Sequence, residues 1–275
     1  MEADSRHVTL LAQQLGVSDG TKAVVTPGVK HTGNRGAELD DDRRQTYRSA
    51  AMRLSYLAQD RPDVSFSSKE IARDMSAPDE AAWTALKRCV RYLLGHRRLV
   101  WVFARQAPVS YLDLWSDADF AGCVRTRRST SCSALMMGGH LLRFSATTQA
   151  VQALSTCESE FYGMVKGGSI LLGAVAMAKD LGAMMKARMR YDATAGAGIA
   201  SRRGVGKIRH LHMPCLWLQK HVQDKHIELM KVDGLKSVAD VGTKHLDAKA
   251  MWKCINGMGV ENRDGESKLA LTVRG

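Results

Sequence analysis

Four acidic residues stand where the chain changes direction, and carboxylates in such places can bind metal ions. Three follow strand-like runs and one lies in the first turns of a long apolar helix; they are Asp117, Asp192 and Asp240, and Glu160. Carboxylates that converge without a basic partner repel one another, so such a cluster is expected to hold divalent cations. Two hard cations about 3.5–4 Å apart would stabilise the attacking and leaving oxygens of a phosphodiester.

Each acid also has a plainer structural interpretation. An aspartate after a strand is commonly a turn or cap residue, and we prefer that role for Asp119. A glutamate in the first turn of a helix complements the helix dipole. Glu158 and Glu160 lie about 200° apart around a helix, so only one can face a sheet, and periodicity does not decide which. Asp40–Asp42 are expected to be a solvated charge run.

The elements that must position these acids follow a strand-and-helix alternation after Pro108. Gly138-Gly139 indicates a hairpin, and Ser155 with Glu158 indicates a capping box at the start of the long helix. The order β-β-β-α-β-α-β-α predicts an α/β domain with a mixed sheet. Strands are expected over 109–116, 131–137, 140–146, 186–191 and 227–232, and helices over 155–181, 213–223 and 248–256.

The first hundred residues have a different pattern. Residues 1–46 are rich in Gly, Asp and Thr and are expected to be poorly ordered. Helical spacing begins at Tyr47, breaks at Pro62 and resumes, and the clearest helix follows an S-x-x-D cap at Ser76–Asp79. We therefore expect a small helical segment before the mixed sheet.

The net charge of +12 over 275 residues predicts an anionic partner, either nucleic acid or an acidic membrane surface. Basic residues are dense from Lys186 to Arg209, where Asp192 is the only acid. This stretch is either a solvated basic face or a surface that contacts phosphates. The candidate phosphate contacts are Arg188, Arg190, Arg202, Arg203 and Lys207.

Cysteine spacing and hydropathy bear on the cellular setting. The six cysteines form no C-x-x-C pair, which favours a reducing, intracellular compartment, cytoplasm or nucleus. His210, His212 and Cys215 lack a second ligand pair, so no zinc is expected there. The N-terminus has no signal-peptide pattern, and the run from Ile170 to Ala178 is shorter than the roughly 20 residues that span a bilayer. We therefore expect no membrane partner.

Several stretches in a fixed order resemble a known family. The sequence is similar to the C-terminal part of copia-type LTR-retrotransposon polyproteins, comprising the connection segment after the polymerase and the ribonuclease H domain. The resemblance lies in Tyr47–Asp63 (YRSAAMRLSYLAQDRPD), Trp115–Thr130 (WSDADFAGCVRTRRST), Gln149–Tyr162 (QAVQALSTCESEFY), Arg202–Leu211 and Val238–Leu246 (VADVGTKHL).

The resemblance implies a ribonuclease H fold with strand order 3-2-1-4-5 and flanking helices. It implies hydrolysis of the RNA strand of an RNA–DNA hybrid with two Mg²⁺ ions, Mn²⁺ being a substitute, as part of a larger reverse transcriptase polyprotein. The matching acids are Asp117, Glu160, Asp192 and Asp240, with His210 as an auxiliary residue that either assists product release or packs. The implied segments are a remnant or linker over 1–46, a connection segment over 47–106, the nuclease over 109–258 and a tail over 259–275.

The sequence departs from the family pattern at several positions. Phe120 replaces a tryptophan, Cys157 and Ser159 flank Glu160, and glycines at 196 and 198 are expected to loosen the helix start after Asp192. The Tyr-x-Asp-Asp polymerase motif is absent, so we predict no polymerase activity. The alternatives are a catalytically decayed remnant that still binds nucleic acid, a nuclease or integrase of similar fold that cuts DNA, and a zinc-dependent interaction module.

Overall fold

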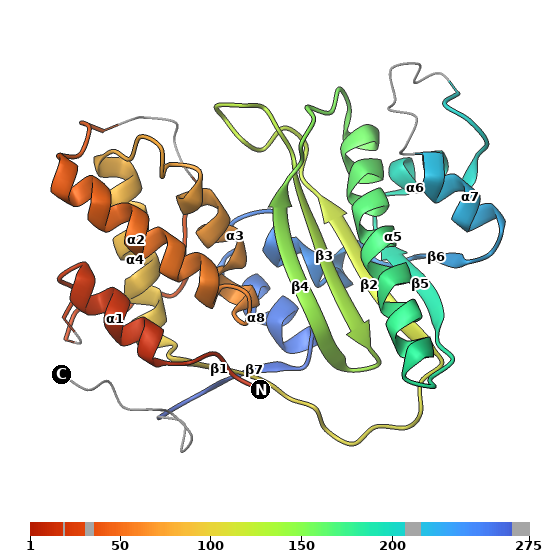
Figure 1. Ribbon diagram of the computed structural model, residues 1–275, viewed down its shortest axis with the longest axis horizontal. Helices are drawn as coiled ribbons and strands as arrows, with labels where there is room; N and C mark the ends of the chain where they lie inside the picture. Colours follow the sequence, from red (N-terminus) through yellow and green to blue (C-terminus); the bar gives the residue numbers. More distant parts are fainter. Residues whose placement is uncertain (19, 31–35, 207–215, 266–275) are drawn as a thin grey trace. The chain divides into compact units, whose positions relative to one another are not determined.

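The computed structural model describes residues 1–18, 20–30, 36–206 and 216–265, which form two compact units (Figure 1). Unit 1 comprises Met1–Val102, His245–Asn256 and the segment from Val260. Unit 2 comprises Phe103–Lys244 and Gly257–Gly259. All four acids singled out from the sequence lie in unit 2.

Unit 2 is built on a five-stranded mixed sheet with the order β4-β3-β2-β5-β6. Strands β2, β3 and β4 pair antiparallel, whereas β5 and β6 continue the sheet in parallel with β2. Numbered by appearance within the unit, this order is 3-2-1-4-5, as expected. The strands are β2 (Tyr111–Ala118), β3 (Thr130–Met137), β4 (His140–Thr148), β5 (Lys186–Tyr191) and β6 (Ile227–Lys231).

The long helix α5 (Thr156–Asp180) packs on one face of this sheet (Figure 1). It begins where predicted, because the Ser155 side chain accepts a hydrogen bond from the Glu158 N–H at 3.2 Å. Its buried stripe includes Phe161, Met164 and Leu171 and meets Leu114 of β2 in the core. The C-terminal end of β2, which carries Asp117, is therefore held next to the first turns of α5.

By length and composition, α5 is also apolar enough to cross a membrane, with a mean hydropathy of 1.4 over 18 residues. A core helix of a globular domain passes the same test. Here its buried stripe packs on β2, β3 and β5, and it carries the buried carboxylates of Glu158 and Glu160. These contacts are those of a helix that covers a sheet.

Four shorter elements complete the part of unit 2 that the structure describes. Helix α6 (Thr194–Ser201) follows β5, α7 (Trp217–Gln223) precedes β6, and the 3-10 turns η2 (Gly234–Lys236) and η3 (Ala239–Gly242) follow β6. Helix α6 differs from the expectation that the two glycines would loosen this segment. It packs against α5, and its buried glycine, Gly196, makes that approach possible.

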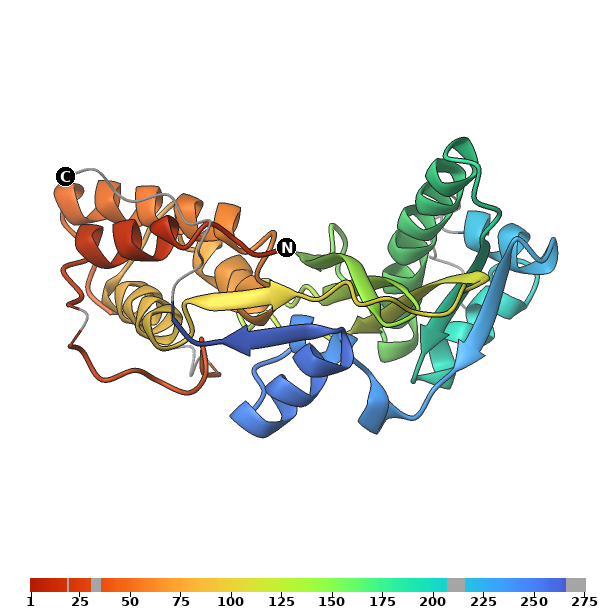
Figure 2. The same ribbon diagram turned by 90° about the horizontal axis from the view of Figure 1, so that it is seen from below.

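Unit 1 is mainly helical and includes chain segments far apart in sequence. Its strands β1 (Arg98–Trp101) and β7 (Val260–Arg263) pair antiparallel, as Figure 2 shows. The helices are α1 (Arg6–Gln14), α2 (Asp41–Leu57), α3 (Pro62–Ala72), α4 (Glu80–Gly95) and α8 (Ala248–Gly257), whose last residue is counted with unit 2.

The structure differs from the expected segmentation at both ends of the chain. Residues 1–46 contain α1, which buries Val8 and Leu11 against α2 and α4, rather than forming a poorly ordered stretch. Residues 260–263, expected to lie in a tail, form β7. The apolar face of α1 orders the N-terminal segment, and pairing with β1 orders residues 260–263. Both depend on contacts with residues distant in sequence.

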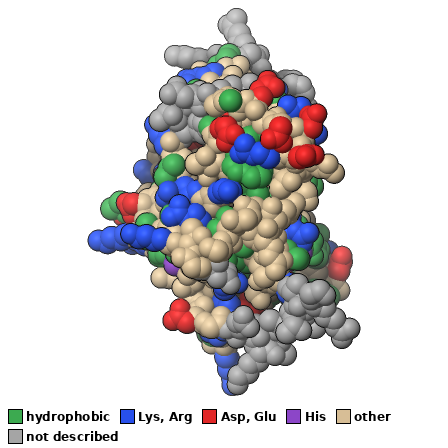
Figure 3. All heavy atoms as spheres, turned by 90° about the vertical axis from the view of Figure 1, so that its left-hand side faces the viewer, with side chains coloured by type: hydrophobic (Ala, Val, Ile, Leu, Met, Phe, Trp, Pro, Cys, Tyr) green, Lys and Arg blue, Asp and Glu red, His purple; other side chains and the backbone are tan. Residues whose placement is uncertain are grey.

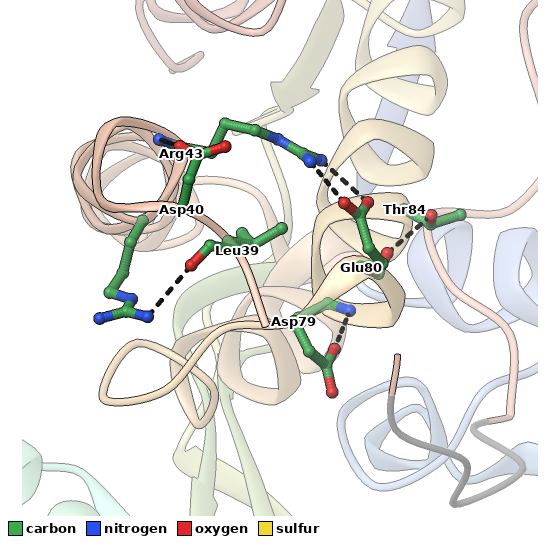
Figure 4. Close-up of polar contacts among 8 residues, drawn as sticks. Leu39, Asp40, Arg43, Asp79, Glu80 and Thr84 are labelled. Atoms are coloured by element: carbon green, nitrogen blue, oxygen red, sulfur yellow. Dashed lines mark hydrogen bonds and ion pairs between the residues drawn. The ribbon is translucent and has the colours of Figure 1, made fainter. Parts of the chain in front are cut away.

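The starts of α2 and α4 lie close together in unit 1 (Figure 4). Asp40 caps α2 and Asp79 caps α4, each accepting a backbone N–H at 2.8 Å. Between them, Arg43 binds both carboxylate oxygens of Glu80 and stacks over the Trp83 ring at 4.7 Å. Acidic side chains also lie beside basic ones on the face of unit 1 in Figure 3, so this face is not uniformly positive.

A buried ion pair accounts for the R-P-D stretch of unit 1. Arg61 donates to Asp63 through Nε at 2.9 Å and Nη2 at 2.7 Å, and both side chains are almost completely buried. Tyr92 donates to the same carboxylate at 2.9 Å. The guanidinium also donates to the carbonyls of His96 and Arg97. This network ties the start of α3 to the end of α4.

Candidate metal centre

Three of the four predicted acids come together at one edge of the sheet. Asp117 lies near the end of β2, Asp192 follows β5, and Glu160 lies in the second turn of α5. Each offers a carboxylate oxygen, and these oxygens all lie within 4.8 Å of one another. Because β2 and β5 are neighbouring parallel strands, their carboxyl ends meet at the same edge.

The structure resolves the ambiguity between the two glutamates of α5. The Glu158 carboxylate accepts hydrogen bonds from the Leu154 N–H at 2.9 Å and the Tyr162 hydroxyl at 2.7 Å. It therefore fastens the start of the helix. Glu160 lies on the other side and joins Asp117 and Asp192. Which glutamate faced the sheet could not be obtained from periodicity, because both are buried.

Burial and mutual repulsion raise the affinity of this cluster for positive charge. The pKa of Glu160 is raised to about 8, first by burial and then by the charges of Asp117 and Asp192. The pKa of Asp117 is raised to about 6, mainly by burial, although a hydrogen bond from Thr243 opposes the rise. A site with these properties is stabilised by protons or by a cation.

The fourth acid, Asp240, lies in η3 and is outside the group of three. Its carboxylate forms an ion pair with Lys244 at 2.6 Å, and its charge helps to raise the pKa of both Asp117 and Glu160. The segment that carries it also supplies Thr243, whose hydroxyl donates to Asp117. Thr243 and Lys244 were not predicted to act, although they lie in the VADVGTK stretch that drew attention to Asp240.

The residues present fit a hard divalent cation. All the donors are carboxylate oxygens, which Mg²⁺ and Mn²⁺ prefer. One oxygen of Asp240 is buried without a hydrogen-bond partner among the described residues. A buried acceptor of that kind carries a desolvation penalty that a cation relieves.

Two neighbouring residues shape the site without belonging to it. A Cβ added at Gly196 of α6 would lie 2.7 Å from the Cβ of Glu160, so only glycine allows α6 to approach α5 here. Asp119 accepts a hydrogen bond from the Thr130 N–H, and its own N–H donates to the Thr130 carbonyl at 3.1 Å. Asp119 is thus a turn residue, as preferred from the sequence.

The predicted arginines of β5 have a carboxylate partner that the sequence reasoning missed. Arg188 donates to both oxygens of Asp113 at 2.6 and 2.9 Å, and Arg190 donates to one of them at 2.7 Å. Their guanidinium groups also lie over the rings of Tyr111 and Trp115. Asp113 is directly opposite Arg188 in the ladder, which is why it captures the charge.

The remaining basic candidates lie after α6. Arg203 is exposed, whereas Arg202 donates to the Val205 carbonyl at 2.6 Å. Lys207 and the auxiliary candidate His210 lie outside the described residues. A role in phosphate contact stays a prediction for all of these side chains.

The chain resembles curated plant transposon proteins over most of its length. It is 27% identical over 248 residues to the retrovirus-related Pol polyprotein from transposon RE2 of Arabidopsis thaliana, which is 87% of this chain and 17% of that protein. It is 25% identical over 201 residues to the corresponding polyprotein from transposon TNT 1-94 of Nicotiana tabacum, 72% of this chain and 15% of that protein. The chain thus spans less than a fifth of these relatives. No protein-family model matches it.

Among solved structures, the chain is similar to LC11-RNase H1, isolated from compost by a metagenomic approach. The likeness has a TM-score of 0.35 and 12% identity, and covers 54% of this chain and 99% of that one.

The sheet order and the acids at its edge define a ribonuclease H-like domain. The sequence relatives are Pol polyproteins of plant transposons. Their similarity to this chain is consistent with the ribonuclease H region of a copia-type retrotransposon polyprotein.

Proposed function

We propose that this chain cleaves the RNA strand of an RNA–DNA hybrid as part of a retrotransposon polyprotein. The convergence of Asp117, Glu160 and Asp192 carries the proposal, because three buried or half-buried carboxylates within 4.8 Å are useful only to a cation or a proton. Similarity to the Pol polyproteins and the ribonuclease H-like sheet support the same substrate class.

Asp117, Glu160, Asp192 and Asp240 would hold two Mg²⁺ ions, with Mn²⁺ as a substitute. When bound, such ions lower the pKa of a water and neutralise charge on the scissile phosphate and the leaving oxygen. The protein's own part is to keep the carboxylates fixed and desolvated. Thr243 orients Asp117 by donating to one oxygen, and Gly196 lets α6 close over Glu160.

Lys244 supports Asp240 through their ion pair, and its positive charge lowers the pKa of Asp117 and Glu160. It therefore favours the ionised carboxylates that bind a metal. The hybrid would be held through its phosphates by exposed basic side chains such as Arg203, and RNA would be recognised by groove shape and 2′-hydroxyl groups.

Cleavage of a labelled RNA–DNA hybrid with Mg²⁺ tests the proposal. We expect RNA fragments that end in a 5′-phosphate, an intact DNA strand, and no cleavage of duplex DNA. Asp117→Asn should lower the rate by at least 100-fold. If wild-type protein cleaves no faster than Asp117→Asn, the proposed nuclease activity is refuted. If hybrid binding also persists in chelator, the result favours a decayed remnant that still binds nucleic acid. Cleavage of duplex DNA would favour the DNA nuclease.

A further inference from the structure

Away from the acids, two histidines of unit 2 lie side by side where α7 ends and β6 begins. The Nδ1 atoms of His221 and His226 are 3.2 Å apart. His226 is exposed, His221 is half-buried, and His221 also packs against the Trp217 ring at 4.5 Å. Neither histidine has a part in the proposed nuclease site.

The backbone holds this pair in place. Helix α7 ends with the His226 N–H donating to the His221 carbonyl at 2.9 Å and the Lys225 N–H donating to the Val222 carbonyl at 3.1 Å. Lys225 adopts the left-handed conformation, with φ of 58°. These are the features of a Schellman motif, which brings the third-last helical side chain next to the second residue beyond the cap. The contact is usually apolar, and here it joins two imidazoles.

The spacing of the two nitrogens suits a shared metal ion. In a tetrahedral site with metal–nitrogen bonds of about 2.0–2.1 Å, two ligand nitrogens lie about 3.3 Å apart. The observed 3.2 Å is close to that separation. Imidazole is a preferred ligand of Zn²⁺ and Cu²⁺. The His221 side chain is half-buried and that of His226 is exposed, so solvent can reach both.

We propose that His221 and His226 form a two-imidazole site for a divalent transition metal ion of the Zn²⁺ and Cu²⁺ group, with water as the remaining ligands. The site is separate from the sequence cluster of His210, His212 and Cys215, which lies outside the described residues.

An ion at this place would fasten the end of α7 to the start of β6. Helix α7 in turn holds the loop that carries the candidate phosphate contacts. Gln219 donates to the carbonyls of Ile199 and Gly204, and Gln223 donates to the carbonyl of Arg202. Metal binding is therefore expected to stiffen this loop as well as the turn between α7 and β6.

The test is metal binding by the full chain and by His221→Ala, His226→Ala and the double variant. With Zn²⁺ in a chelator competition, we expect each single variant to bind at least tenfold more weakly than wild type, and the double variant to lose less than the sum of the two single losses. His7→Ala, which alters a histidine of unit 1 packed against Tyr56, is the matched control and should bind as wild type does.

Cu²⁺ provides a second readout that a general loss of folding would not mimic. Electron paramagnetic resonance of the protein with one equivalent of Cu²⁺ should show two coordinated imidazole nitrogens in wild type and one in each single variant. Unchanged Zn²⁺ affinity in the single variants, or losses that add in the double variant, would overturn the proposal. Equal thermal midpoints in chelator verify that the variants remain folded.

Discussion

Replacing Glu160 by glutamine should stabilise the metal-free protein at alkaline pH. The carboxylate of Glu160 is buried near Asp117 and Asp192, and its pKa is raised from 4.5 to about 8. A group whose pKa is higher in the folded state contributes stability below its unfolded pKa, and that stability is lost as the pH rises towards the folded value. Metal-free wild-type protein should therefore weaken between pH 4.5 and pH 8.

The magnitude follows from the slope of about 1.4 kcal/mol per pH unit for one proton. From pH 5 to pH 8 the wild-type free energy of unfolding should fall by about 3–4 kcal/mol through this group alone, a large part of the 5–15 kcal/mol typical of a domain. Glu160→Gln cannot ionise, so this part of the slope should disappear. At pH 8 the variant should be the more stable protein.

Urea unfolding in chelator and in 10 mM Mg²⁺, from pH 5 to pH 8.5, measures both effects. Mg²⁺ at 100 times its dissociation constant would restore about 2.7 kcal/mol to wild type and much less to the variant. Glu158→Gln is the matched control, because it weakens the helix start while leaving the pH slope in place. A Glu160→Gln variant with the wild-type pH slope, or one less stable than wild type at pH 8, would refute the electrostatic reasoning.

Three further changes test the surroundings of the site and the frame of unit 1. Gly196→Ala should lower the free energy of unfolding in urea by about 1–3 kcal/mol and weaken Mg²⁺ binding, because the added Cβ would press on Glu160. Gly198 has open space around it, so Gly198→Ala should stabilise α6. Equal effects of the two substitutions would contradict the close approach of α6 to α5. Thr243→Val should lower the affinity for Mg²⁺ measured by calorimetry and have little effect on folding, because it removes the donor to Asp117 and raises the pKa of that carboxyl further. An unchanged affinity would exclude a role of Thr243 in positioning Asp117. Asp63→Asn should destabilise unit 1 by about 3–5 kcal/mol in thermal unfolding, because it leaves the Arg61 charge buried without its partner. Asp41 is exposed, so Asp41→Asn should leave stability unchanged. An Asp63→Asn variant as stable as wild type would refute the stabilising role of the buried ion pair.

Sequence patterns were informative wherever local spacing determines the outcome. The strands of unit 2 and the start of α5 were predicted from local patterns, since the Ser155 cap is a local feature. The strand order was predicted only from the family resemblance. The acids at the sheet edge were found because they follow strand-like runs or begin a helix, and the family resemblance matched the same residues. Short elements were missed when they depend on distant partners. Strand β7 has four residues and pairs with β1, more than 150 residues earlier in the chain.

The charges were harder to predict than the elements. Arg188 and Arg190 looked available for phosphates until the register of β2 and β5 placed Asp113 between them. The pairing of Asp113 with Arg188 depends on the strand register, which the sequence alone does not reveal. The left-handed turn at Lys225, which joins the two histidines, likewise has no signal, because glycine is the usual residue there.

We propose that Asp117, with Glu160 and Asp192, forms a metal site that cleaves RNA in a hybrid. Single-turnover cleavage of a hybrid labelled on the RNA strand, comparing Asp117→Asn with the turn variant Asp119→Asn, tests it most directly. We expect Mg²⁺-dependent cleavage that Asp119→Asn retains within about tenfold and Asp117→Asn loses. Equal rates for the two variants, or cleavage by wild type in chelator, would contradict it.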